Sequence, residues 1–125
     1  MTESSDSRPR PLAGIKVVDC TRVLSGPICS RMLSDMGAEV VKIKAPESDI
    51  LRSTPPLVGG FGSMFSQYNA GKRNVPPDLQ REGGPELLAR LARDEGASVH
   101  NFLPRVLPPL ALTLGPPRSV HPLTI

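Results

Sequence analysis

The feature that most constrains the fold of this chain is a strand–helix–strand pattern within residues 15–43. The run Ile15 to Asp19 (IKVVD) is short and nearly all apolar, as expected for a strand buried on both faces. Pro27 suits the first turn of a helix, Gly37 ends that helix, and a second apolar run, Ala38 to Ile43, follows at once. Such a connection makes the two strands parallel, with a right-handed crossover. We therefore predict an α/β sheet that binds ligands at the carboxyl ends of its strands.

The pattern continues downstream with less regularity. Residues 45–63 contain six prolines and glycines, which predict a long loop, and Met64 to Tyr68 are expected to form a helical turn. Lys72 to Val75 read as an extended segment that two prolines interrupt, which argues against a central strand. Gly84-Pro85 opens a second amphipathic helix, and Ser98 to Phe102 read as another short strand. The order β-α-β-loop-β-α-β indicates one α/β domain.

Both ends of the chain differ from this pattern. Residues 1–11 are polar and charged where a signal peptide would be apolar, so we expect a disordered leader. Six of the 15 prolines follow Phe102, a density that neither a helix nor a sheet strand tolerates. The sequence thus predicts a leader at 1–11, an α/β domain at 12–106 and an irregular, proline-rich tail at 107–125.

Composition argues against several classes of function. A net charge of +3 with scattered charges and 3% aromatic residues does not suit nucleic acid, and no apolar run is long enough to span a membrane. Cys20 and Cys29 lack the spacing of a zinc site or a disulfide framework, so we expect small buried side chains in a reduced, cytoplasmic protein. His100 and His121 have no neighbours at ligand spacing, and no metal is expected.

Four collinear blocks of the sequence resemble the opening of the class III CoA-transferases. They are LAGIKVVDCTRVLSGPICSRMLSDMGAEVVKIKAP (Leu12 to Pro46), GGFGSMFSQYNAGKRNV (Gly59 to Val75), DLQREGGPELLARL (Asp78 to Leu91) and VHNFLPRV (Val99 to Val106). The family includes formyl-CoA and carnitine-CoA transferases and acyl-CoA racemases. The resemblance implies a partial Rossmann-like parallel sheet with flanking helices, and acyl-CoA as a substrate in place of a resident cofactor. It also implies an interlocked homodimer for full-length members, which this chain is too short to form.

The resemblance further implies where the coenzyme binds. Family members use the segment around Leu24 and Ser25 to border the thioester end of CoA, and the helix start that follows offers N–H groups to an anion. The family's Asn-x-x-Lys-Arg motif falls on Asn69 to Arg73, where two adjacent cations suit the CoA phosphates. The predicted coenzyme-binding residues are Leu24, Ser25, Lys44, Asn69, Gly71, Lys72, Arg73, Asn101 and Phe102.

Structural readings compete with these assignments. Residues 69–73 also suit an exposed basic turn, Lys44 a solvated charge at a sheet edge, and Phe102 a core position. Three family contact positions carry unusual residues here, namely Leu24, Ala45 and Pro109.

The chemistry of the family lies downstream of the blocks that match. In the transferases an aspartate attacks the acyl-CoA carbonyl, giving a mixed anhydride and then an aspartyl-CoA thioester. In the racemases an acid–base pair moves the proton beside the thioester carbonyl. We assign no catalytic residue to this chain, place the end of the resemblance near Val106, and expect the chain alone to be inactive. Three hypotheses stay open: a CoA-transferase fragment, an acyl-CoA racemase fragment, and a non-catalytic remnant that binds CoA or nothing.

Overall fold

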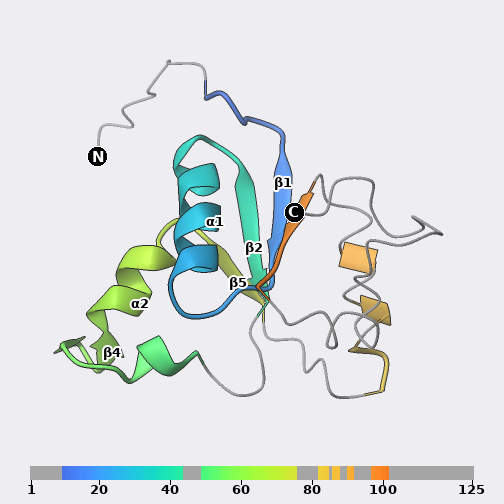
Figure 1. Ribbon diagram of the computed structural model, residues 1–125. Helices are drawn as coiled ribbons and strands as arrows, with labels where there is room; N and C mark the ends of the chain where they lie inside the picture. The colour runs from blue at the N-terminus through green and yellow to red at the C-terminus, as the bar shows by residue number, and fades with distance from the viewer. Residues whose placement is uncertain are drawn as a thin grey trace.

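A four-stranded parallel sheet forms the centre of the chain. The computed structural model describes residues 10–43, 49–75, 82–84, 86–87, 90–91 and 97–101. The sheet contains β1 (Lys16–Asp19), β2 (Glu39–Ile43), β5 (Arg73–Val75) and β6 (Ala97–Val99), in the spatial order β5-β2-β1-β6 (Figure 1). In chain order this is third, second, first, fourth, as in the first four strands of the doubly wound fold. The predicted parallel α/β sheet is confirmed.

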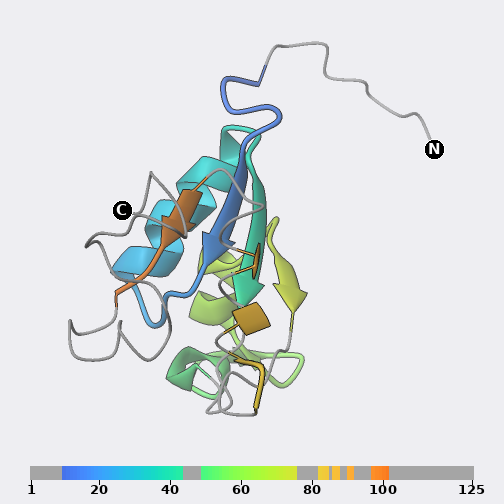
Figure 2. The ribbon, with the colours of Figure 1, turned by 90° about the vertical axis from the view of Figure 1, so that its right-hand side faces the viewer.

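Helices flank the sheet on both sides. Helix α1 (Ser25–Asp35) connects β1 to β2 and lies against one face, with α2 (Ser63–Tyr68) on the same side (Figures 1 and 2). Gly37, at φ 105°, ends the turn after α1, as its position in the sequence predicts. The described residues between Gly84 and Leu91 are helical and lie on the other side of the sheet (Figure 1). The core between these layers is made of Val17, Ala38, Val40 and Val99, with Leu12, Leu33 and Ala97 packed against it.

The segment predicted as a long loop contains more structure than expected. It holds the 3₁₀ helix η1 (Ile50–Arg52) and a hairpin of β3 (Leu57–Val58) and β4 (Phe61–Gly62). Gly59 and Gly60 form the two-residue turn with φ of 58° and 84°, the positive values that the favoured hairpin turn requires. The Gly-Gly pair between the apolar residues Leu57-Val58 and Phe61 was therefore a hairpin signal, although each strand is too short to show a periodicity.

Most other predicted elements are confirmed. Helix α2 forms the turn predicted at Met64 to Tyr68, and β6 forms the strand predicted at Ser98 to Phe102, with slightly different bounds. Strand β5 pairs only with β2 among the described strands, so it lies at the sheet edge. Residues 1–9 of the predicted leader and the whole predicted tail, 107–125, lie outside the described residues, as do residues 102–106.

One prediction about side-chain burial is wrong. Cys20 is buried as expected, but Cys29 is exposed on α1. The apolar side chains of Ile28, Met32 and Met36 on α1 are exposed as well. The face of α1 that packs on the sheet instead carries Gly26, Pro27 and Ser30. No helix in the described ranges has the length and apolar character needed to cross a membrane.

Candidate functional site

The candidate site lies where β1 and β6 end side by side. The order of strands along the chain reverses between these two neighbours, and ligands of open α/β sheets bind at such a point. We call residues 20–24, which follow β1, the β1 exit loop. The side chain of Asn101, just after β6, binds both backbone groups of Arg22: its Oδ1 accepts from the Arg22 N–H at 3.2 Å, and its Nδ2 donates to the Arg22 carbonyl at 2.9 Å. Two segments 79 residues apart are thus joined at the carboxyl end of the sheet.

Two more side chains bind the backbone of the β1 exit loop. Lys42, near the end of β2, donates from Nζ to the Thr21 carbonyl at 2.8 Å. Asp49 accepts from the Val23 N–H at 3.1 Å through Oδ2, while its Oδ1 accepts from the Leu51 N–H at 3.1 Å and starts η1. Asp49 therefore ties the β1 exit loop to the segment that begins the hairpin region.

Val23 has an unusual backbone conformation. Its φ of 68° lies in the left-handed region, which a β-branched residue rarely adopts. Strained backbone of this kind persists only where surrounding contacts enforce it, and it clusters at functional sites. The side chains of Val23 and of its neighbour Leu24 are both exposed at this turn.

Beneath the loop, Asp19 is the centre of a buried polar network. Its carboxylate is fully buried; Oδ1 accepts from the N–H and Oγ1 of Thr21 at 2.8 and 2.5 Å, and Oδ2 accepts from Ser30 Oγ at 2.6 Å. The ammonium of Lys72 lies 2.9 Å from Oδ2, and that of Lys42 lies 3.5 Å from it. We call Asp19, Thr21, Ser30, Lys42 and Lys72 the Asp19 network. Asp19, the last residue of β1, thus acts as a hydrogen-bond acceptor at the end of the strand.

Burial and neighbouring charges shift the pKa values of Asp19, Lys72 and Cys20. Burial alone raises the pKa of Asp19, but the charge of Lys42, the hydroxyls of Ser30 and Thr21 and the charge of Lys72 together hold this pKa below its ordinary value. Burial lowers the pKa of Lys72, and attraction to Asp19 only partly offsets that effect. Burial also raises the pKa of Cys20 to about 12, which makes this thiol unreactive.

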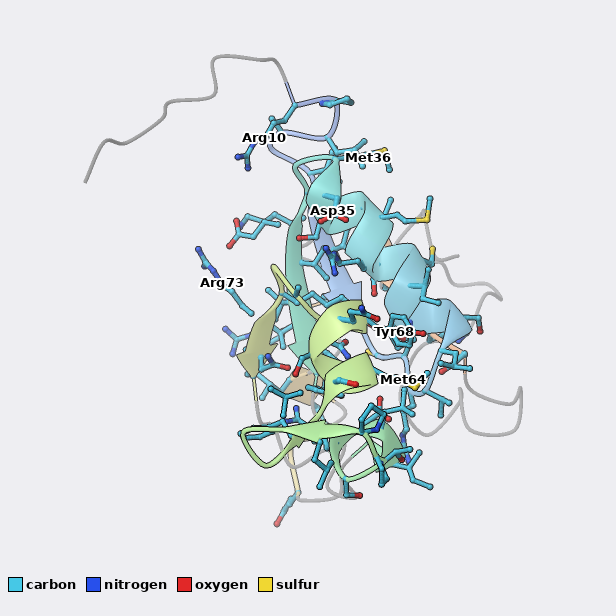
Figure 3. All side chains as sticks on the ribbon, turned by 90° about the vertical axis from the view of Figure 1, so that its left-hand side faces the viewer. Arg10, Asp35, Met36, Met64, Tyr68 and Arg73 are labelled. Carbon is cyan, nitrogen blue, oxygen red and sulfur yellow. The ribbon has the colours of Figure 1, made fainter. Side chains whose placement is uncertain are left out.

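The adjacent cations Lys72 and Arg73 point in different directions. The Lys72 ammonium is inside the fold, where it donates to Asp19, to the Pro27 carbonyl at 2.9 Å and to Asn69 Oδ1 at 3.0 Å, so all three of its donors are used. The Arg73 side chain is 75% exposed, extends away from α1 (Figure 3) and pairs with Glu39 at 2.8 Å. Coenzyme contact by either residue stays a prediction, and in this structure the two do not form a joint phosphate site.

The other predicted contact residues are distributed as follows. Leu24 and Ser25 are exposed at the start of α1, which no side chain caps, and the N–H groups of Ser25 and Gly26 have no acceptor in the described part of the chain. Asn69 is buried and donates to the Phe65 carbonyl at 2.9 Å, while the Gly71 carbonyl accepts from Ser34 at 3.3 Å. Lys44 and Phe102 lie outside the described residues.

Gly26 has a steric reason to be glycine. A Cβ at this position would lie 2.3 Å from the Cβ of Thr21, so only glycine allows α1 to begin against the β1 exit loop. The close approach that requires glycine here is thus made by Thr21 of the protein itself.

Sequence reasoning missed Asp49, Ser30 and Lys42 as parts of this region. Asp49 had a readable signal, because an aspartate just before Ile50 and Leu51 is a common helix N-cap. Ser30 had none, since a serine within a helix gives no indication that it faces a buried carboxylate.

The sequence belongs to CoA-transferase family III, which it matches over residues 12–124. The match continues past Val106, so the expectation that the resemblance ends there is wrong. The succinyl-CoA:mesaconate CoA-transferase of Haloarcula hispanica is 38% identical over 96 residues, covering 73% of this chain and 24% of that protein. The formyl-CoA:oxalate CoA-transferase of Streptomyces avermitilis is 34% identical over 114 residues, covering 90% of this chain and 28% of that protein.

Solved structures agree with this assignment. A CAIB/BAIF family protein from Brucella suis superimposes with a TM-score of 0.83 and 33% sequence identity, over 94% of this chain and 32% of that one. The chain thus spans about a quarter to a third of the length of the relatives that it matches.

Proposed function

We propose that this chain is the amino-terminal, coenzyme-binding part of an enzyme that transfers CoA between acyl groups. The observation that carries the proposal is the meeting of the β1 exit loop, the uncapped start of α1 and Asn101 at the strand-order reversal. Membership of CoA-transferase family III indicates that the ligand is CoA. The sheet order also supports the Rossmann-like description that the family resemblance implies.

The proposed ligand is acyl-CoA, a polyanion, and the local electrostatics suit it. The N–H groups at the start of α1 and the positive end of the helix dipole favour an anionic group in front of Ser25. Below them the Asp19 network contains two ammonium groups and one carboxylate, which leaves one positive charge in excess. Both features attract an anion while the two ammonium groups, on Lys42 and Lys72, stay buried.

For the chemistry of the acyl group we propose only the reaction class, which is transfer of CoA. The two curated relatives named above transfer CoA between acids, which favours transfer over racemisation for this chain. The described residues would bind and orient the coenzyme, and the nucleophilic aspartate expected of the family is assigned to none of them. Cytoplasmic location, the status of the chain as a fragment, and a homodimer of the complete protein rest on the sequence expectations alone.

Isothermal titration calorimetry with CoA tests this proposal directly. The purified chain, shown to be folded by a cooperative thermal transition, is expected to bind CoA and to release measurable heat. Pantetheine and adenosine 3′,5′-bisphosphate, which represent the two halves of CoA, would show which half contributes the affinity. A folded chain that gives no heat at millimolar CoA would contradict the proposal.

An activity assay tests whether this chain binds the coenzyme without holding a catalytic residue of its own. We expect the chain alone not to move CoA between two acyl donors. Transfer at a rate that a substitution within residues 1–125 abolishes would show that this chain holds its own catalytic residue.

A further inference from the structure

The β1 exit loop is held by side chains from three other parts of the fold. Its consecutive carbonyl and N–H groups at residues 21–23 are bound by Lys42, Asn101 and Asp49. Such loops usually satisfy their backbone groups with water or with one another, because they lie at the surface. Here these four groups have fixed partners from three separate parts of the fold, with both groups of Arg22 bound by Asn101. The conformation that results is the strained one at Val23.

We propose that Asn101 and Asp49 are positioning residues, which hold Arg22 and Val23 in the strained turn so that the start of α1 faces the coenzyme. This inference rests on the proposed CoA site. It assigns Asn101 a different role from the coenzyme contact that the family resemblance implied, because its Oδ1 and Nδ2 both bind Arg22.

The chemistry of the two side chains fits this role. The task at Arg22 needs one acceptor and one donor on the same short side chain, which asparagine has and aspartate lacks. The task of Asp49 needs two acceptors, one for Val23 and one for Leu51, and asparagine would supply only one oxygen. Asn101 thus suits its two bonds better than an aspartate would, and Asp49 suits its two bonds better than an asparagine would.

The effect on the site follows from geometry. Leu24 is the N-cap of α1, directly after Val23, so a change of the Val23 backbone redirects the first N–H groups of the helix. Releasing Asn101 or Asp49 lets Val23 return to the common negative φ. The anion-facing N–H groups would then lose their fixed direction.

Amide hydrogen exchange on the whole chain without ligand tests the positioning itself. We expect Asn101→Ala to speed exchange at the Arg22 amide at least tenfold, and Asp49→Asn to do so at the Val23 amide. The Val18 and Val40 amides in the sheet report whether the fold is intact, and Arg73→Ala is the matched control at an exposed residue. Unchanged exchange at Arg22 and Val23 in folded variants would overturn the proposal.

Rescue by glycine separates positioning from direct contact. Asn101→Ala is expected to weaken CoA binding about tenfold, and adding Val23→Gly should recover most of that loss, because glycine adopts positive φ without strain. If Asn101 touched the coenzyme, Val23→Gly would not restore the affinity, and that result would overturn the proposal. If the unaltered chain binds no CoA, the proposed function fails, while the exchange experiment still decides the role of Asn101 and Asp49.

Discussion

The Asp19 network and the β1 exit loop are adjacent at the end of β1, but they satisfy their polar groups in opposite ways. The network is interior and uses charged side chains on one another, with Asp19 between Lys42 and Lys72. In the loop at the surface, side chains bind backbone groups instead: Asn101 and Asp49 bind Arg22 and Val23, and Lys42 also binds the Thr21 carbonyl. The Asn-x-x-Lys-Arg motif thus contributes its lysine to the scaffold, whereas the N–H groups of Ser25 and Gly26 at the start of α1 have no acceptor among the described residues.

The largest expected effect comes from breaking the network at its centre. Asp19→Asn leaves two ammonium groups without their counter-charge, and loss of one partner of a buried ion pair costs about 3–5 kcal/mol. Urea denaturation measures this free energy of unfolding. The control is Asp35→Asn, which removes an exposed pair with Arg31 and should cost at most about 1 kcal/mol. Equal effects of the two substitutions would show that the network does not support the fold.

The second prediction separates the two neighbouring cations. Lys72→Met leaves Pro27 and Asn69 without their buried donor and removes one of the two counter-charges of Asp19, while Lys42 remains. We expect a loss of about 1–3 kcal/mol in the free energy of unfolding. Arg73→Met removes only an exposed ion pair and should change it by less than about 1 kcal/mol. Thermal denaturation of both variants checks this. A larger effect at Arg73 than at Lys72 would reverse the assignment of scaffold and surface.

The third prediction concerns the contact between the start of α1 and the β1 exit loop. Gly26→Ala places a methyl group against Thr21, and overpacking of this kind costs about 1–3 kcal/mol. Ser25→Ala, at the exposed neighbouring position, should stay within about 0.5 kcal/mol in the same denaturation experiment. If both alanine variants were equally stable, α1 would not be fixed against the β1 exit loop.

The smallest expected effect is a pH dependence. The pKa of Asp19 is lower in the fold than its ordinary value of 3.8, so its contribution is complete above that value and is lost as the pH falls through the lowered one. The stability gap between the unaltered chain and Asp19→Asn should therefore narrow on acidification. A gap that stays constant from pH 6 to pH 2 would contradict the shift.

The sequence predicted the fold better than the site, for physical reasons. Apolar runs such as Ile15 to Asp19 and glycines such as Gly37 act locally, so the strands and the end of α1 could be read from the chain. The direction of the Lys72 side chain depends on Asp19, 53 residues away, and no local pattern contains that information. Likewise, Asn101 was among the predicted coenzyme-binding residues, but its bonds to Arg22 appear only once β1 and β6 are adjacent.

Nuclear magnetic resonance with ¹⁵N-labelled protein tests the central claim most directly, by mapping which amides respond to CoA. We expect the largest changes in amide chemical shift at Leu24, Ser25 and Gly26, with little change at Arg73. Changes centred on Arg73, or no change at millimolar CoA in a folded chain, would contradict it.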